Sequence, residues 1–169
     1  MGNFRKKYIF LSQMINLTGT YECKIDDKGR LKVPSALMKQ LSSFGEESFV
    51  IKSSIHRPCV EVYPQKGWDK LMAKLDNLDV TFNPKHGDFL RIFLKGVKVV
   101  EIDASERLQI SKDLVQYARL SKEVVVTCMS GLFEVWDKAE YDEKVRISEE
   151  DFAKMTQEIM ANKNNQNVS

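Results

Sequence analysis

The sequence repeats itself at an offset of 77 residues, and this duplication restricts the possible folds more than any other feature of the chain. Residues 25–41 read IDDKGRLKVPSALMKQL, and residues 102–118 read IDASERLQISKDLVQYA. The likeness continues, with small gaps, through two later apolar runs in each copy. A unit of about 45 residues buries too little apolar surface to fold alone. We therefore expect the two copies to pack against each other as a pseudo-twofold pair.

Both copies predict the same order of elements. In the first copy a strand at 21–25 leads into a polar turn at 26–29, and alternating apolar and polar residues predict a second short strand. A short helix follows near Pro34, because proline suits the first helical turn, and two β-rich runs complete the copy. The matching segments of the second copy are 99–102, 103–106, a helix near Ser111, and runs at 124–126 and 133–136. This order predicts a mixed β/α fold.

The stretch between the two copies is predicted to be helical. Apolar residues at helical spacing predict one helix there, and they are Trp68, Leu71, Met72, Leu75 and Leu78. Asn83-Pro84 is a typical start for a second helix. Phe89, Ile92 and Phe93 give that helix an apolar side. We expect these aromatic and methionine positions to lie in the core.

The C-terminal part of the chain predicts an amphipathic helix. Ser148 with Asp151 three residues later resembles a capping box. Phe152, Met155 and Ile159 then form one apolar stripe. The stripe packs either on its own domain or on a neighbouring subunit, and the sequence leaves both open. The final residues, NKNNQNVS, carry no core residue and are expected to form an unfolded tail.

The N-terminal residues MGNFRKKYIFLSQMIN resemble a signal peptide only faintly. Their apolar part is too short and no small-residue cleavage site follows, so we interpret residues 1–18 as an N-terminal extension. Met14 is an alternative start of translation. No stretch of the sequence approaches the roughly 18–20 apolar residues of a membrane helix, so we expect no membrane association.

Each copy carries the pattern Asp-x-x-x-Arg in its first polar turn, as Asp26 and Arg30 and again as Asp103 and Arg107. At this spacing the carboxylate can accept turn amide hydrogens and meet the guanidinium, and Gly29 can supply a positive φ. One copy alone would indicate an ordinary turn closed by an ion pair. Arginine in both copies favours a need for its planar, bidentate head, as for a phosphate or a guanine edge.

The charges favour DNA binding by the first copy. The net charge of +2 excludes a polycation that binds DNA through bulk charge. Residues 19–67 hold eight Lys and Arg against six Asp and Glu, whereas residues 97–143 hold six against ten. Four basic residues lie within nine positions of the first copy, namely Lys24, Lys28, Arg30 and Lys32; the second copy has Glu101, Ser105, Arg107 and Gln109 at these places. We expect Arg30 to contribute more DNA affinity than Arg107, and several subunits to bind repeated sites together.

Enzymatic activity is not expected, because the sequence lacks the P-loop, GxSxG, HExxH and GxGxxG patterns. The cysteines, Cys23, Cys59 and Cys128, are odd in number and far apart, which fits neither a disulfide framework nor a four-cysteine zinc site. His56 and Cys59 could be half of a metal site or a nucleophile pair, but a loop histidine and a core cysteine explain them better. No catalytic residue, metal, cofactor or small-molecule substrate is predicted.

The sequence resembles the MraZ family of bacterial transcriptional regulators, which carry tandem SpoVT/AbrB-type domains. The resemblance covers roughly residues 17–147, and it depends on the paired turns and on four runs: KGRLKVP at 28–34, RPCVEVYP at 57–64, RLSKEVVV at 119–126 and FEVWDKAEYD at 133–142. It implies a swapped-hairpin β-barrel formed by the two repeats, ring-shaped homo-oligomers, and sequence-specific binding of double-stranded DNA. The family acts, usually as a repressor, at direct repeats upstream of its own gene in the division and cell-wall cluster, which implies a cytoplasmic, nucleoid-associated protein.

Carried over by position, the DNA-binding residues are Arg30, Lys28, Lys24, Lys32, Gly29 and Arg107, and the residues that organise the turns are Asp26 and Asp103. The second repeat departs from the family pattern, since Glu106 stands where glycine is usual and Ser111 where proline is usual. Glu106 would repel phosphate, so Arg107 either contacts DNA, holds its turn through Asp103 or Glu106, or lies at a subunit contact.

The resemblance and the repeats together divide the chain into six parts: an extension at 1–18, repeats at 20–66 and 98–142, a helical connector at 67–97, a C-terminal helix at 143–162 and a tail at 163–169. A ring-forming scaffold without DNA binding is the main alternative function. An antitoxin-like protein of the same barrel class is another, although one barrel half per chain would be expected there.

Overall fold

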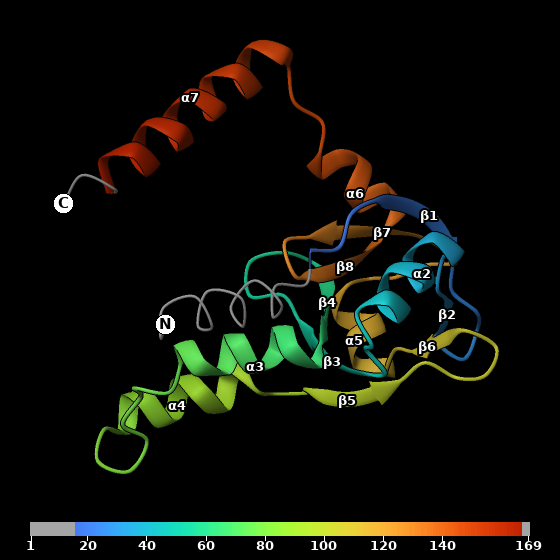
Figure 1. The fold of residues 1–169 in the computed structure, drawn as a ribbon, viewed down its shortest axis with the longest axis horizontal. Coiled ribbons are helices and arrows are strands. Elements are labelled where there is room, and N and C mark those ends of the chain that lie inside the picture. Colours follow the sequence, from blue (N-terminus) through green and yellow to red (C-terminus); the bar gives the residue numbers. More distant parts are fainter. Residues whose placement is uncertain (1–15, 167–169) are drawn as a thin grey trace, which may run out of the picture. The chain divides into compact units, whose positions relative to one another are not determined.

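A computed structural model describes residues 16–166, and the chain divides after Lys138 into two compact units (Figure 1). The N-terminal extension therefore lies almost wholly outside the described residues. The first repeat contains β1 (Thr20–Lys24), β2 (Arg30–Lys32), α2 (Ser35–Ser43), β3 (Ser48–Ser53) and β4 (Cys59–Pro64). The second repeats this order as β5 (Lys98–Glu101), β6 (Arg107–Gln109), α5 (Lys112–Tyr117), β7 (Glu123–Met129) and β8 (Leu132–Asp137). The mixed β/α fold and its duplicated order of elements are confirmed.

The strands form a six-stranded antiparallel sheet in the order β1-β7-β8-β4-β3-β5 and a separate two-stranded sheet of β2 and β6. If each strand is replaced by its counterpart in the other repeat (β1 by β5, β3 by β7, β4 by β8), the same order is read from the opposite edge of the sheet. A pseudo-twofold axis between the repeats produces this symmetry. The first strand of each repeat pairs with the hairpin of the other, because β1 lies beside β7 and β5 beside β3. Among the described residues, these hydrogen-bonded strands do not close the barrel that the resemblance implies.

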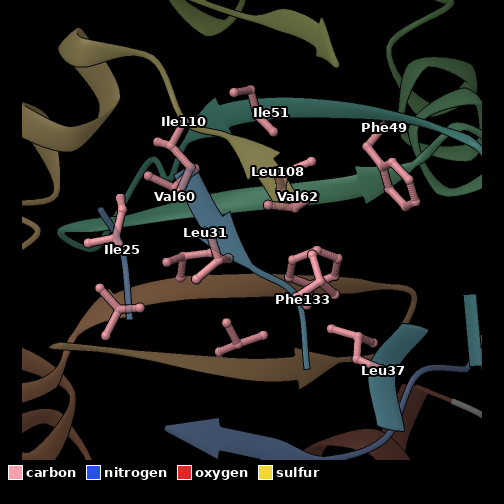
Figure 2. Close-up of a cluster of buried hydrophobic side chains, with 14 of the residues drawn as sticks. Ile25, Leu31, Leu37, Phe49, Ile51, Val60, Val62, Leu108, Ile110 and Phe133 are labelled. Carbon is pink, nitrogen blue, oxygen red and sulfur yellow. The ribbon is translucent and has the colours of Figure 1, made fainter. Parts of the chain in front are cut away.

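The core lies between the β2–β6 pair and one face of the six-stranded sheet. Figure 2 shows Leu31 and Leu108 among side chains that include Val62 and Phe133. These side chains are fully buried, and Leu37 of α2 joins the same cluster. Both repeats contribute, so the prediction that neither could bury its apolar face alone agrees with this packing.

The opposite face of the sheet carries a buried lysine. Lys52 of β3 is 2% exposed, and its Nζ lies 3.3 Å from Oε1 of Glu61 on the neighbouring strand β4. The ammonium also donates to the carbonyl of Ser53 and lies 4.6 Å from the ring centroid of Phe93. A buried charge requires such partners, because an unpaired ammonium would be strongly penalised inside the protein.

Two helices connect the repeats, α3 (Gln65–Lys74) and α4 (Pro84–Phe93). The predicted start of α4 is confirmed, since the Asn83 side chain accepts a hydrogen bond from the backbone N–H of Lys85. The first helix ends at Lys74, short of Leu75 and Leu78. The backbone N–H groups of Leu75 and Asp76 donate to carbonyls three residues earlier, as in a 3₁₀ turn. Asp76 and Asn77 are residue types that favour turns over helix interiors.

The prediction that the connector's apolar residues lie in the core is wrong. No residue of α3 is fully buried, and Gly87 is the one buried residue of α4. Phe89 and Ile92 are exposed, Ile92 to 76%. Helical spacing shows that one side of a helix is apolar, but it does not show that the same chain covers that side.

The second unit contains α6 (Lys138–Lys144), whose first residue ends the first unit, and α7 (Glu149–Gln166). The predicted cap is confirmed, since the Ser148 hydroxyl accepts from the backbone N–H of Asp151. The expected unfolded tail from 163 is wrong for its first four residues, because α7 continues to Gln166. Residues 163–166 are polar and add no apolar face, but they continue the helix through its backbone hydrogen bonds.

Candidate nucleic-acid interface

The two arginines of the repeated turns lie on one small β-ribbon, formed by β2 and β6. The strands pair antiparallel, with Arg30 opposite Gln109, Leu31 opposite Leu108 and Lys32 opposite Arg107. Because side chains alternate along a strand, the two leucines share the face that packs on the core. The polar side chains at both ends of each strand therefore share the outer face of this β2–β6 ribbon.

The first turn, residues 26–29, is held by Asp26. Its Oδ1 accepts from the backbone N–H groups of Lys28 (3.0 Å) and Arg30 (2.9 Å), and its Oδ2 accepts from Nε of Arg30 at 2.6 Å. Gly29 has φ +78°, and a Cβ there would lie 2.5 Å from the carbonyl oxygen of Ile110. Glycine is therefore required both by the backbone conformation and by the close approach of the second repeat.

The second turn, residues 103–106, has the same hydrogen bonds. Oδ1 of Asp103 accepts from the backbone N–H groups of Ser105 (2.8 Å) and Arg107 (2.9 Å), and Oδ2 accepts from Nε of Arg107 at 3.0 Å. Glu106 stands at the position of Gly29 with φ 60°, a conformation that side chains other than glycine adopt at a cost. Of the alternatives for Arg107, an ion pair with Asp103 is the one that the structure shows.

Each aspartate positions one edge of its arginine and leaves the other edge available. The hydrogen bonds of both guanidinium groups run through Nε, and within residues 16–166 their Nη atoms have no protein partner. The side chains are 30% exposed for Arg30 and 34% for Arg107. This arrangement fixes a planar donor pair at the surface, where it can bind a phosphate or a guanine edge with little loss of side-chain freedom.

The carboxylates are held in their charged form. The backbone N–H of Arg30, followed by its guanidinium, holds the pKa of Asp26 below the ordinary value of 3.8, against an opposing contribution from desolvation. For Asp103 the backbone N–H groups of Arg107 and Ser105 lower the pKa in the same way, again with the guanidinium assisting. Both ion pairs are therefore intact at neutral pH.

Side chains from each repeat brace the turn of the other. Nε2 of Gln109 donates to the carbonyl of Lys28 at 2.6 Å, and Nζ of Lys32 donates to the carbonyl of Ser105 at 2.7 Å. Backbone bonds repeat the symmetry, from Ile110 to Gly29 and from Val33 to Glu106. The two turns thus form one cross-braced unit.

The basic residues predicted to bind DNA do not all lie at the first turn. Nζ of Lys32 lies 3.4 Å from Oε2 of Glu106, so its charge is partly offset by the second turn. Lys24 ends β1 in the six-stranded sheet, opposite Glu123, and is not part of the ribbon. Lys28 is exposed in the first turn, beside Arg30. The structure therefore brings Lys28, Gly29 and Arg30 together at one place and puts Lys24 on another sheet.

Two lysines of the second repeat lie beside the first turn, and sequence reasoning missed them. A surface hollow there, which we call the basic hollow, is lined by Lys28, Lys112 and Lys122, with Asp26 and Asp27 as its acidic members. Asp26 is already paired with Arg30. Counting charge repeat by repeat could not find these lysines, because the exchange of strands between repeats is what carries them to the first turn.

The hollow beside the second turn has the opposite charge. It is lined by Asp103, Glu101, Glu46 and Glu47 and by no lysine or arginine among the described residues. Asp103 is paired with Arg107, and Oε1 of Glu46 lies 3.9 Å from Nζ of Lys66. The other two carboxylates, Glu47 and Glu101, disfavour a phosphate backbone by Coulomb repulsion. The difference in charge between the two copies is therefore present in space as well as along the sequence.

His56 and Cys59 do not form a reactive pair. His56 is exposed in the loop before β4, whereas Cys59 is buried with its Sγ 3.5 Å from Oε2 of Glu134. Burial and the charge of Glu134 raise the pKa of the Cys59 thiol. A thiol held in this neutral form is a poor nucleophile and metal ligand.

Among residues 16–166, none of the helices has the length and apolar character needed to cross a membrane.

The family model described as "MraZ protein, putative antitoxin-like" matches the chain twice, over residues 16–91 and 93–163. The chain belongs to the MraZ family. Each match contains one of the two repeats with its turn, and together they confirm the resemblance carried by the paired turns. MraZ relatives of similar length support the assignment. Transcriptional regulator MraZ of Christiangramia forsetii is 46% identical over 156 residues, 92% of this chain and 100% of the relative.

More distant MraZ relatives also span nearly the whole chain. Transcriptional regulator MraZ of Flavobacterium psychrophilum is 44% identical over 151 residues, 89% of this chain and 96% of the relative. The protein of the same name from Moorella thermoacetica is 32% identical over 142 residues, 84% of this chain and 95% of the relative.

Gly29 and Glu106 occupy equivalent positions in the two turns, and substitutions at these positions should have different effects on stability. Gly29→Ala should destabilise the protein by roughly 1–3 kcal/mol, because it adds a left-handed alanine and a clash with the Ile110 carbonyl. Glu106→Gly should leave stability unchanged or raise it by up to about 1 kcal/mol. Urea unfolding followed by circular dichroism measures both. Equal losses from the two changes would contradict the pseudo-symmetry of the turns.

The hydrogen bonds that Asp26 and Asp103 accept within their turns, which we call the aspartate locks, predict a pH dependence of stability. Because folding lowers both pKa values, the locks contribute fully above the ordinary value of 3.8 and lose their contribution as the pH falls through the lowered values. The free energy of unfolding of the wild type should therefore exceed that of an Asp26→Asn/Asp103→Asn variant near neutral pH. The difference should shrink at acidic pH. A difference that stayed constant would show that the carboxylates do not hold the turns.

Proposed function

We propose that this chain is a sequence-specific DNA-binding transcriptional regulator whose main DNA contact is the first turn. The observation that carries this proposal is the guanidinium of Arg30, fixed through Nε by Asp26, a residue that also lines the basic hollow with its three lysines. The MraZ relatives named transcriptional regulators support it. Binding to double-stranded DNA would use the Nη edge of this guanidinium, which has no protein partner within residues 16–166.

The shape of the β2–β6 ribbon suits the major groove. A two-stranded β-ribbon fits this groove, and arginine is the commonest side chain that reads guanine there. Arg30 would read a base edge or a phosphate, while Lys28, Lys112 and Lys122 would neutralise flanking phosphates. Gly29 would contribute through the shape of the turn that presents Lys28 and Arg30, since the space a Cβ would need is taken by the Ile110 carbonyl of the second repeat. Lys32 and Arg107 would contribute less, since Glu106 and the acidic hollow lie beside them.

One chain offers too few basic side chains for tight, specific binding. Specific DNA complexes commonly bury about 1,000–2,500 Å² of protein surface, and a single turn with its hollow covers only part of that. We infer that several chains assemble as a ring and bind direct repeats in a promoter together, so that affinity rises by avidity. Repression of its own division and cell-wall gene cluster is the action that the family resemblance favours, which would place the protein in the cytoplasm at the nucleoid.

The swapped-hairpin barrel belongs to the same proposal. Its support is the shared core beneath the ribbon and the single bridge between Ile25 and Leu31, which links the end of β1 to β2. The six domain boundaries predicted from sequence stay part of this proposal, with the C-terminal helix extended to Gln166. A scaffold that assembles without binding DNA is the second candidate, favoured by the exposed apolar residues of α4 and α7.

Substitution of the two arginines should test the proposal. We expect Arg30→Ala to weaken binding to the promoter fragment upstream of the protein's own gene by roughly 10-fold or more, and Arg107→Ala by less. Arg91→Ala is a matched control, because Arg91 is exposed on α4 and pairs only locally with Asp88. Fluorescence anisotropy at several salt concentrations measures the affinities. Equal losses from Arg30→Ala and Arg107→Ala would contradict the asymmetry, and assembly without DNA binding at low salt would favour the scaffold.

Lysines of the basic hollow should affect the salt dependence of binding. Lys112→Ala and Lys122→Ala should each weaken binding to all DNA sequences alike and lower the slope of log affinity against log salt by about 1, since each removes one phosphate contact. Lys85→Ala, on exposed α4, serves as the control and should leave the slope unchanged. A slope unaffected by both hollow variants would show that the phosphates bind elsewhere.

A further inference from the structure

The basic hollow gathers three lysines from separate segments of the chain. Lys28 belongs to the first turn, Lys112 is the first residue of α5, and Lys122 lies just before β7. All three are exposed, and within residues 16–166 none of their side chains forms a hydrogen bond or an ion pair. Of the two acids that line the hollow, one is already neutralised by Arg30. The hollow therefore keeps an excess of positive charge.

The same hollow is concave and partly apolar. Its volume is about 530 Å³, which lies within the range of roughly 300–1,000 Å³ that is usual for small-molecule sites. The half-buried side chains of Val115 and Leu120 line it together with Ile25 and Ile110. A duplex phosphate backbone would use the lysines but would leave these apolar residues without a contact. A smaller anion with an apolar ring would use both.

The hollow beside the second turn is the counterpart of the basic hollow in the other repeat. Apolar residues at matching positions line the two hollows: Ile25 and Ile102, Val115 and Met38. The alignment of residues 49–51 with 124–126 puts Glu47 of the second hollow at the position of Lys122. Because the same fold forms with glutamate or with lysine at this position, the lysine is not required for folding and is available to a ligand.

We infer that the basic hollow binds a nucleotide-class anion, with two or more phosphate charges and an aromatic base, and that this anion competes with DNA for the first turn. Its phosphates bind Lys28, Lys112 and Lys122, because ammonium groups bind phosphate oxygens as point charges. Its base packs on Val115 and Leu120. This inference rests on the proposed function, since competition requires that DNA use the same lysines.

Isothermal titration calorimetry of the full chain, without DNA, tests the site. ADP and inorganic pyrophosphate carry similar charge, but only ADP has a base. Compared at one ionic strength and without divalent cations, ADP should bind roughly 10-fold more tightly, because its base is removed from water against apolar side chains. Equal affinities would show that the hollow collects polyanions by charge alone, and this result would overturn the inference.

Variants of the hollow locate the bound anion. Lys112→Ala and Lys122→Ala should each weaken ADP binding by roughly 10-fold, because each removes a charged hydrogen bond to phosphate. Lys85→Ala removes the same charge from an exposed position on α4 and should leave the affinity unchanged. Circular dichroism checks that each variant is folded. An ADP affinity that neither hollow variant changes would put the anion elsewhere and overturn the inference.

Competition with DNA tests the second part of the inference. ADP should release the promoter fragment from the wild-type chain at concentrations near its own dissociation constant, and pyrophosphate at the same ionic strength should release less. Bound ADP that leaves the DNA affinity unchanged would overturn the competition.

The two proposals can fail separately. A chain that binds the promoter fragment but not ADP would overturn this inference and leave the proposed function standing. A chain that binds ADP through Lys112 and Lys122 but ignores DNA at low salt would overturn the proposed function, and the competition with it, while the anion site would stand.

Discussion

Pairing between β2 and β6 is the interaction on which the rest of the structure depends. It puts Leu31 and Leu108 into the shared core and leaves Arg30 and Arg107 on the outer face of the same ribbon. The same pairing lets Gln109 brace the first turn from the second repeat. Stability and the candidate DNA interface therefore have one physical origin, since a shift of register by one residue would bury the arginines and expose the leucines.

Exchange of strands between the repeats explains why two similar turns have different surroundings. Each turn lies against the helix and loop of the opposite repeat, so Lys112 and Lys122 lie at the first turn while Glu46 and Glu47 lie at the second. Both turns keep the same hydrogen bonds from their aspartate, which indicates that these bonds serve folding in both; the proposed DNA contact uses mainly the first turn. A duplicated fold can in this way keep its symmetry in the backbone and lose it in the charges.

The exposed apolar residues follow a different logic from the core. The alternation of β2 and β6 predicted correctly which residues are buried, because one small ribbon has only one core to face. The stripe of α4 was assigned wrongly to the core, because spacing identifies an apolar side without naming its partner. Ile92, on that apolar side of α4, is 76% exposed.

The sequence by itself determined the duplication, the order of elements in each repeat, the helix starts at Asn83 and Ser148, and the two aspartate–arginine turns, because these depend on local spacing and capping. Only the tertiary structure decided which charges meet at each turn. It tied Lys32 to the second turn and carried Lys112 and Lys122 to the first. These contacts join residues more than 70 positions apart or depend on the fold around them, so no local pattern in the chain records them.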